Sequence, residues 1–379
     1  MNDIIQYDVT IIGGGLAGLA LSIQLSKLGH HVALFEKETY PFHKVCGEYI
    51  SMESWNFLES LGLPLSAMNL PIIKKLIVSA PNGISLNATL PLGGFGISRY
   101  KIDNDLKNIA VANNVMVYEK CKVDEVIFAN EVFTLHSSLG NFSSKICCGT
   151  FGKKSNLDIK WKRDFIHHKN NKLSNYVGIK YHIKTSFPHD TIALHNFKDG
   201  YCGISQIEDD KFCLCYLTNA SNLSHNNNSV QELEQNVLKK NKHLKYIFEN
   251  SELLFKAPVT ISQISFNKKS QVHDHVLLMG DAAGVITPLC GNGMSMALHG
   301  SKIAAALVHD FLNGKINRQQ LELNYIKQWK KIFATRLFTG RIIQEFFGKA
   351  WGTNLFIQLM KLMPFITRKL IRQTHGKPF

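Results

Sequence analysis

Three glycines near the N-terminus have the spacing of a phosphate-binding turn. Gly13, Gly15 and Gly18 form a GxGxxG pattern between a short β-branched apolar run and a segment with leucines at helical spacing. In such a turn the first glycine permits the sharp bend, the second lets the backbone approach a pyrophosphate, and the third lets the helix pack closely on the strand. The free N–H groups of the helix N-terminus, at Leu16 and Ala17, then face the phosphates. The pattern therefore predicts a dinucleotide-binding site.

A carboxylate follows the turn at the distance that such sites use. Glu36 ends the next apolar run, about twenty residues after the glycines, where it can accept hydrogen bonds from ribose hydroxyls. A carboxylate at this position disfavours the 2′-phosphate of NADP. We predict NAD or FAD as the ligand, with Glu36 and the adjacent Lys37 among the binding residues.

A second glycine-rich segment, residues 275–305, distinguishes between these two ligands. An acid at the end of a predicted strand can bind a polyol, and the N-terminus of a helix directs its positive dipole end at negative charge. Reduced flavin carries such charge beside its ribityl chain, whereas NAD has no equivalent chain. The segment therefore predicts FAD, bound by Gly280, Asp281, Pro288, Gly291, Gly293 and Met294.

The same segment resembles the GDAAH/G…P…GxGxxxA motif of FAD enzymes with the para-hydroxybenzoate hydroxylase fold. That superfamily includes aromatic-ring hydroxylases, flavin halogenases and geranylgeranyl reductases. The stretch "ISRYKIDNDL", residues 97–106, is similar to the family's Arg-x-x-hydrophobic-Asp-x-x-Leu segment. The arginine of that segment reaches the ribityl–phosphate region of the flavin, which gives Arg99 this role by resemblance. The likeness covers residues 8 to about 345, with the motifs in the same order.

The stretch "KVCGEYIS", residues 44–51, is similar to the Lys-x-Cys-Gly segment of the reductase branch. In that branch the segment lies beside the isoalloxazine ring, so the resemblance implies that Lys44, Cys46 and Gly47 lie near the flavin. Lys44 would favour the thiolate form of Cys46 electrostatically. The alternative is that Gly47 permits close approach of the backbone while Cys46 only packs. No ligand partners stand at metal-binding spacing, and we expect no metal site.

The element pattern and the resemblance together predict the fold class and the domains. We expect an α/β (α+β) chain with a Rossmann-like FAD-binding domain, an inserted, mainly antiparallel β-sheet substrate domain and C-terminal helices. Within the insert a helix is expected at residues 229–241. The FAD-binding domain is expected in three parts, residues 1–75, 97–156 and 269–345. A hairpin at 76–96 is expected to contribute to the β-rich substrate domain at 157–268, and a basic amphipathic segment follows at 346–379.

Two departures from the family bear on the reaction. Residues 149–155 read "GTFGKKS" where aromatic hydroxylases have GADGxxS, so Phe151 replaces an acid that contacts the flavin. Residues 198–206 read "KDGYCGISQ" where isoprenoid reductases have Pro-x-x-Tyr-x-Trp-x-Phe-Pro; Tyr201 matches, and Gly203 stands at the tryptophan. The first segment keeps more of its pattern than the second, which favours a monooxygenase over a reductase. Cys46 and Tyr201 are the candidate catalytic residues.

The predicted function is an FAD-dependent monooxygenase that hydroxylates a hydrophobic or phenolic small molecule. The alternative is reduction of a C=C bond in an isoprenoid or lipid-like substrate. The four tryptophans stand far apart, which excludes the Trp-x-Trp segment of flavin halogenases. The sequence has no second GxGxxG, so we expect NAD(P)H to dock transiently as electron donor, or a separate flavin reductase to supply the electrons. A flavoprotein with altered catalysis is a third alternative, because Phe151 breaks the hydroxylase pattern.

The net charge is +14, which raises the question of a nucleic-acid or anionic-lipid partner. The basic residues are dispersed rather than interleaved with stacking aromatics, so no nucleic acid is expected. The apolar and basic segment 346–379 has two interpretations: a peripheral contact with the inner face of a membrane, or a helix that covers the FAD-binding domain. Scattered cysteines without CxxC pairs predict a reduced, cytoplasmic protein.

Overall fold

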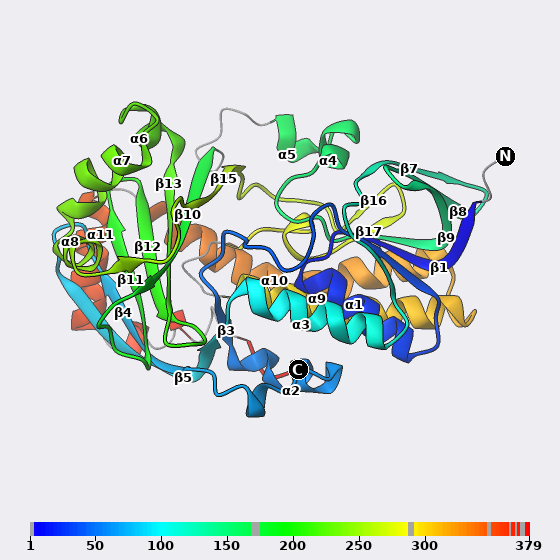
Figure 1. The fold of residues 1–379 in the computed structure, drawn as a ribbon, viewed down its shortest axis with the longest axis horizontal. Coiled ribbons are helices and arrows are strands. Elements are labelled where there is room, and N and C mark those ends of the chain that lie inside the picture. The colour runs from blue at the N-terminus through cyan, green and yellow to red at the C-terminus, as the bar shows by residue number, and fades with distance from the viewer. Residues whose placement is uncertain are drawn as a thin grey trace.

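The computed structural model describes residues 4–167, 175–286, 292–346, 350–363, 365–367, 370–371 and 376–379. Two β-sheets stand at the two ends of an elongated molecule, and long helices run alongside and between them (Figure 1). Pro288 and Gly291, both predicted to bind FAD, lie outside the described residues. Among the helices that are described, none is long and apolar enough to cross a membrane.

The first sheet has eight strands, in the order β16-β17-β9-β1-β2-β6 with β7 and β8 continuing from β9. Strand β1 pairs in parallel with both β2 and β9, and helix α1 connects β1 to β2. Strand β2 is buried along its whole length, as expected for a parallel strand covered on both faces. The predicted strand–turn–helix–strand unit is therefore present. The strands are β1 (Ile5–Ile12), β2 (Val32–Phe35), β6 (Met116–Tyr118), β7 (Val123–Ala129), β8 (Val132–Ser137), β9 (Gly140–Gly149), β16 (Val272–His273) and β17 (Val276–Leu278).

The second sheet has nine strands, in the order β14-β10-β13-β12-β11-β4-β5-β3 with β15 paired to β10. Strands β4 and β11 run parallel, and the other pairings of this sheet are antiparallel. A hairpin from the N-terminal part of the chain therefore completes a sheet built mainly from its middle. The strands are β3 (Tyr49–Ser51), β4 (Ile72–Ser79), β5 (Ser85–Gly96), β10 (Tyr176–Lys184), β11 (Thr191–Phe197), β12 (Gly200–Gln206), β13 (Phe212–Asn219), β14 (Glu252–Leu253) and β15 (Val259–Ile264).

The helix predicted at 229–241 is shorter in the structure. Helix α7 ends at Asn236, a 3-10 turn follows, and a further helix that was not predicted, α8, begins at Lys242. Helix α8 begins there because Asn241 caps it, its side chain accepting a hydrogen bond from the backbone N–H of His243. The helices of the described residues are α1 (Leu16–Lys27), α2 (Trp55–Leu61), α3 (Arg99–Ala112), α4 (Asn156–Lys160), α5 (Asp164–His167), α6 (Ala220–Ser224), α7 (Val230–Asn236), α8 (Lys242–Glu249), α9 (Gly293–Leu312), α10 (Arg318–Phe346) and α11 (Ala350–Leu362), with 3-10 turns at Met52–Ser54, Leu65–Ala67, Leu238–Lys240 and Gly280–Ala282.

One cavity lies where the two sheets meet. It is lined by residues that follow the carboxyl ends of β1 and β17, and by residues of β12 and β13 in the second sheet. Helices α1 and α9 pack on each other, and both begin at this cavity. Ligands of parallel α/β sheets bind outside the carboxyl ends of the strands, so the topology marks this cavity as the candidate site.

Candidate cofactor and active site

The glycine turn after β1 has three glycines in three different surroundings. Gly13 has φ +106°, and a Cβ there would lie 2.7 Å from the carbonyl carbon of Thr150. A Cβ on Gly18 would lie 2.2 Å from the carbonyl oxygen of Gly13, so the strand and helix approach each other too closely for any side chain. At Gly15 the nearest atom to an added Cβ is a guanidinium nitrogen of Arg99, 3.7 Å away. Gly15 therefore faces open space, as a glycine that admits a pyrophosphate must.

Glu36 is buried directly behind this turn. One carboxylate oxygen accepts a hydrogen bond from the Gly14 N–H at 2.9 Å, and the other accepts from the Glu38 N–H at 3.1 Å. A carboxylate offers about four lone-pair sites, so both oxygens can still accept a hydrogen bond from a ribose. The adjacent Lys37 is exposed, and its ammonium lies 3.8 Å from Glu38. Glu36 thus braces the turn, whereas Lys37 points to solvent.

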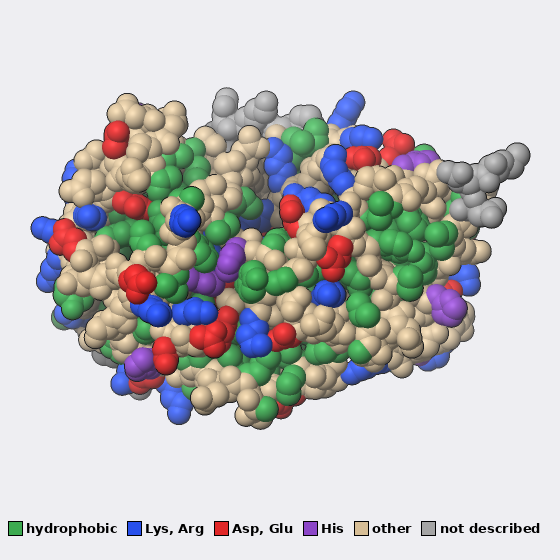
Figure 2. Space-filling view, in the orientation of Figure 1, with side chains coloured by type: hydrophobic (Ala, Val, Ile, Leu, Met, Phe, Trp, Pro, Cys, Tyr) green, Lys and Arg blue, Asp and Glu red, His purple; other side chains and the backbone are tan. Residues whose placement is uncertain are grey.

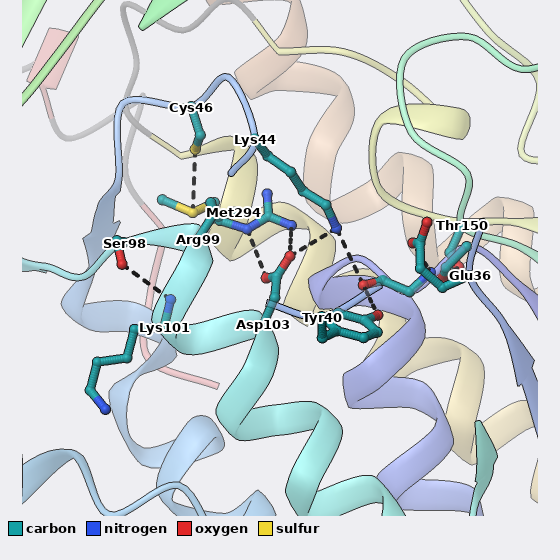
Figure 3. A network of polar contacts seen from close by, with 12 residues as sticks. Glu36, Tyr40, Lys44, Cys46, Ser98, Arg99, Lys101, Asp103, Thr150 and Met294 are labelled. Carbon is teal, nitrogen blue, oxygen red and sulfur yellow. Dashed lines mark hydrogen bonds and ion pairs between the residues drawn. The ribbon is translucent and has the colours of Figure 1, made fainter. Parts of the chain in front are cut away.

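Arg99 opens helix α3 and reaches the turn from the opposite side (Figure 3). Its guanidinium donates two hydrogen bonds to Asp103, at 2.8 and 2.7 Å. Lys44 donates to the same carboxylate at 2.9 Å and to the carbonyl of Gly14 at 3.4 Å. Burial by itself would raise the pKa of Asp103, but Arg99 and Lys44 hold it below its ordinary value. Asp103 therefore fixes two cations next to the phosphate turn.

The cavity brings most of the predicted site residues together. Its walls include eleven of them, namely Gly15, Leu16, Ala17, Cys46, Gly47, Arg99, Tyr201, Gly280, Asp281, Gly293 and Met294. Five predicted residues do not line the cavity: Gly13, Gly18, Glu36, Lys37 and Lys44. All of these except Lys37 belong to or contact the glycine turn, which does line the cavity through Gly15. Segments that are far apart in the sequence thus converge on one space, as the cofactor prediction requires.

The loop that carries Cys46 is held against the second sheet. The thiol of Cys213, on β13, donates to the backbone carbonyl of Cys46 at 3.2 Å. The hydroxyl of Ser205, on β12, donates to the carbonyl of Gly47 at 3.3 Å. The sulfur of Cys46 lies 3.6 Å from that of Met294 at the start of α9. A Cβ on Gly47 would meet nothing within 4 Å, so the backbone there is open to a ligand.

Glu48, the next residue, forms a buried cluster that the sequence reasoning missed. It has φ +56°, a conformation that is uncommon for a residue with a side chain. One carboxylate oxygen accepts from the Arg99 N–H at 2.8 Å and from the ammonium of Lys180. The other accepts from Nε2 of His182 at 2.7 Å. A signal was present: Lys180 and His182 alternate on one face of an otherwise apolar strand, which predicts a shared buried partner.

The charges in this cluster are mutually stabilised. Burial alone would raise the pKa of Glu48, but Lys180 and His182 hold it below its ordinary value. Burial alone would lower the pKa of Lys180, but Glu48 holds it above its ordinary value. The Cys213 sulfur, a carboxylate oxygen of Glu48 and a ring nitrogen of His182 all lie within 4.8 Å of one another, a grouping that metal sites also use. Because an ammonium already binds Glu48 and burial raises the pKa of the Cys213 thiol, the geometry is that of an ion-pair cluster.

The remainder of the cavity wall is apolar. Leu194, Leu217, Phe266 and Val285 line it from the second sheet and the segments that follow, and they also form one buried cluster with Tyr201. The molecular surface is hollowed between the two halves of the molecule, and basic side chains gather beside the hollow (Figure 2). One end of the cavity therefore suits phosphates and the other an apolar molecule.

Gly203 and Phe151 occupy the two positions where the sequence departs from known patterns. Gly203 lines the cavity, and a Cβ there would make ordinary contact with Leu194 at 3.5 Å, so the glycine leaves room for a ligand. Phe151 packs its ring beside Gly149 and near Trp161, with ring centroids 6.0 Å apart. Phe151 is thus part of the packing of the first sheet.

Comparison with known sequences gives distant relatives. Residues 11–45 match the model of the NAD(P)-binding Rossmann-like domain family. The chain is 24% identical over 350 residues to conditioned medium factor receptor 1 of Dictyostelium discoideum, and the alignment covers 83% of this chain and 66% of that protein. It is 25% identical over 349 residues to digeranylgeranylglycerophospholipid reductase of Methanococcus vannielii, with 86% and 83% covered. The chain thus spans about two thirds of the length of the first of these relatives.

Comparison with solved structures shows the fold. The flavin-dependent brominase Bmp2 is similar with a TM-score of 0.79 at 20% identity, covering 97% of this chain and 93% of that one. A geranylgeranyl bacteriochlorophyll reductase-like protein of Thermoplasma acidophilum has a TM-score of 0.77 at 17% identity, covering 100% and 97%. The chain has the fold of flavin-dependent oxidoreductases such as these. The expected fold class, a Rossmann-like domain with an inserted, mainly antiparallel sheet, is confirmed.

Proposed function

We propose that the protein is an FAD-dependent oxidoreductase that acts on a hydrophobic small molecule. One observation carries the proposal: a single cavity joins the open glycine turn at Gly15, the arginine Arg99 and the strand-end acid Asp281 to apolar side chains of the second sheet. A cofactor with a pyrophosphate, a polyol and a ring fits this series of groups better than a ligand with phosphate alone. The flavin-dependent brominase of the same fold supports the choice of flavin.

The residues present divide the binding of FAD among them. The N-terminus of α1 and Arg99 would hold the pyrophosphate, and Glu36 would hold the adenosine ribose. Asp281 would bind the ribityl hydroxyls, while Gly47 and the start of α9 would approach the ring. FAD supplies hydride or oxygen chemistry when bound, and the protein positions substrate and excludes water.

Hydroxylation is the reaction we favour. The substrate end of the cavity is apolar, with Leu194, Leu217, Phe266 and Val285 in its walls, and such walls would disfavour water beside a reactive oxygen donor. Reduction of a C=C bond is the second candidate. It is favoured by Cys46 and Tyr201, which both line the cavity and carry an S–H and an O–H that could protonate a substrate carbon. The similarity to a lipid reductase also supports it.

Electrons would come from NAD(P)H that docks transiently, or from a separate flavin reductase. Lys153 lines the cavity on the side of the first sheet, where its ammonium could attract an anionic donor. Two measurements test the function together. The purified protein is loaded with FAD, and NADH and NADPH oxidation is followed with phenolic and isoprenoid substrates. Incorporation of ¹⁸O from labelled dioxygen would establish hydroxylation, and substrate reduction without dioxygen would establish the second candidate instead.

A further inference from the structure

Helix α11 is apolar on two opposite faces. Ile357 and Met360 lie on one face and are buried. Leu355, Leu359 and Leu362 lie on the other at helical spacing, and all three are more than two-fifths exposed, Leu362 by 79%. A helix that only covers the protein needs one apolar face. The outer face of α11 is therefore an apolar surface that is exposed to solvent.

This surface continues past the end of the helix. Met363 is exposed, and Phe365 is 74% exposed. We call Leu355, Leu359, Leu362, Met363 and Phe365 together the α11 face. Single exposed apolar residues are common on proteins, but contiguous exposed patches of large side chains mark contact surfaces.

The charge around the α11 face identifies what it contacts. Residues 346–379 contain no Asp or Glu, and their basic residues are Lys349, Lys361, Arg368, Lys369, Arg372 and Lys377. Of these, Lys361 and Lys377 lie in the described residues and are exposed, but Lys377 belongs to the C-terminal end of the chain, which lies beside α2 (Figure 1). Lys361 stands on α11 beside the exposed face, where its stem can lie along apolar surface while its ammonium reaches outward. Two copies of a chain with a net charge of +14 would repel each other here, whereas an anionic lipid surface would attract it.

Helix α11 is held firmly to the body of the protein. It packs on β5 of the second sheet, and Ile371 beyond it joins a buried cluster with Tyr49, Ile73 and Leu90. A span across a bilayer takes about twenty apolar residues, so a 13-residue helix can only lie in the plane of the surface. Ile192 packs against the same cluster and also lines the cavity. The buried cluster that holds Ile371 therefore extends to the wall of the cavity.

We infer that the α11 face docks the protein peripherally on anionic phospholipid membranes. The apolar side chains enter the boundary between headgroups and acyl chains, and the ammonium of Lys361 beside them binds a lipid phosphate. The inference goes beyond the proposed function and does not depend on FAD.

The test is co-sedimentation of the full chain with vesicles. One set of vesicles is phosphatidylcholine, and the other is phosphatidylcholine mixed with phosphatidylglycerol. The variant replaces three exposed residues of the α11 face, as Leu359→Gln, Leu362→Gln and Phe365→Gln. The matched control replaces three exposed apolar residues elsewhere, as Ile127→Gln, Leu139→Gln and Tyr246→Gln. Circular dichroism and flavin content show that both variants fold.

We expect binding to the anionic vesicles, with little binding to the neutral ones. The α11 variant should bind at least about tenfold more weakly, and the control should bind as the unaltered chain does. Raising the salt from about 0.05 M to about 0.5 M should also weaken binding, because the lipid attraction is electrostatic. Absence of binding to anionic vesicles, or equal loss in both variants, would contradict the inference. So would a dimer, seen by light scattering without vesicle binding, that the α11 variant abolishes.

Discussion

Replacing Glu48 by Gln should destabilise the protein much more than the loss of one hydrogen bond. The substitution keeps the shape of the side chain but removes its charge. It leaves the ammonium of Lys180, which is 0% exposed, facing a neutral amide. The remaining acceptor of that ammonium is the carbonyl of Lys44, at 3.2 Å. A buried cation without a counter-charge is the main cost of the change.

The size of the effect follows from the burial of the pair. Removing one partner of a buried ion pair typically costs about 3–5 kcal/mol, because the other charge remains desolvated. That is a large part of the total stability of a typical protein, about 5–15 kcal/mol. With an unfolding entropy of about 2.1 cal/mol/K per residue, 379 residues give about 0.8 kcal/mol/K, so the melting temperature should fall by about 4–6 °C.

The assay is urea unfolding of the FAD-free protein at neutral pH, since bound FAD would add stability of its own. The double variant Glu48→Gln with Lys180→Met removes both charges and should lie within about 1 kcal/mol of the unaltered chain. Glu234→Gln is the matched control. Glu234 is also buried, but its partners are the hydroxyls of Tyr181 and Tyr216, at 3.0 and 2.7 Å, so no ion pair is broken.

Two results would refute this reasoning. The first is a loss of less than about 1 kcal/mol in Glu48→Gln, no larger than in the Glu234 control. The second is a double variant as unstable as the single one, because the instability would then not come from the unpaired ammonium. Either result would mean that the charges of Glu48 and Lys180 do not stabilise each other as the structure indicates.

Three further predictions concern the site. Gly18→Ala should destabilise the protein and abolish FAD binding, because the added Cβ would clash with the backbone. Gly15→Ala should leave the melting temperature of the FAD-free protein unchanged and weaken FAD binding. Calorimetry measures the first effect and FAD titration the second. Cys46→Ser should retain FAD and lose turnover, which would show that the thiol takes part in the reaction. Unchanged turnover with normal FAD content would leave Cys46 with a packing role only. The ion pair of Glu48 and Lys180 makes its full contribution to the stability of the protein above pH 4.5, the ordinary pKa of a glutamate. The contribution is lost as the pH falls through the lower pKa that Glu48 has in the folded protein. The stability difference between the unaltered chain and Glu48→Gln should therefore shrink in acid, which unfolding at several pH values measures; a constant difference would contradict the charge argument.

The sequence predicted the parts of the site that depend on local spacing. The roles of Gly13, Gly15 and Gly18 follow from one turn between a strand and a helix, and their surroundings in the structure agree with those roles. Glu36 lies behind the turn because it ends the next parallel strand. Such features need only neighbours in the chain, so periodicity and glycine spacing suffice to predict them.

Specific contacts between segments that are far apart in the chain could not be predicted from the sequence. Glu48 and Lys180 are 132 residues apart, and nothing in a single sequence pairs a loop residue with a strand that far away. The exposure of Lys37 was missed because a side chain next to a binding residue can point either way. The hairpin at 76–96 was expected to contribute to the substrate domain, but the parallel pairing of β4 with β11 is a long-range contact that the sequence does not specify. The start of α8, a helix that was not predicted, depends on one cap, at Asn241.

The central claim is that the cavity between the two sheets holds FAD. The most direct measurement is the absorption spectrum of the purified full chain, followed by mass spectrometry of the released cofactor and titration of the FAD-free protein with FAD and with NAD. The account predicts a yellow protein that releases FAD and that rebinds FAD at one site per chain in preference to NAD. A colourless protein that shows no saturable binding of FAD would contradict it.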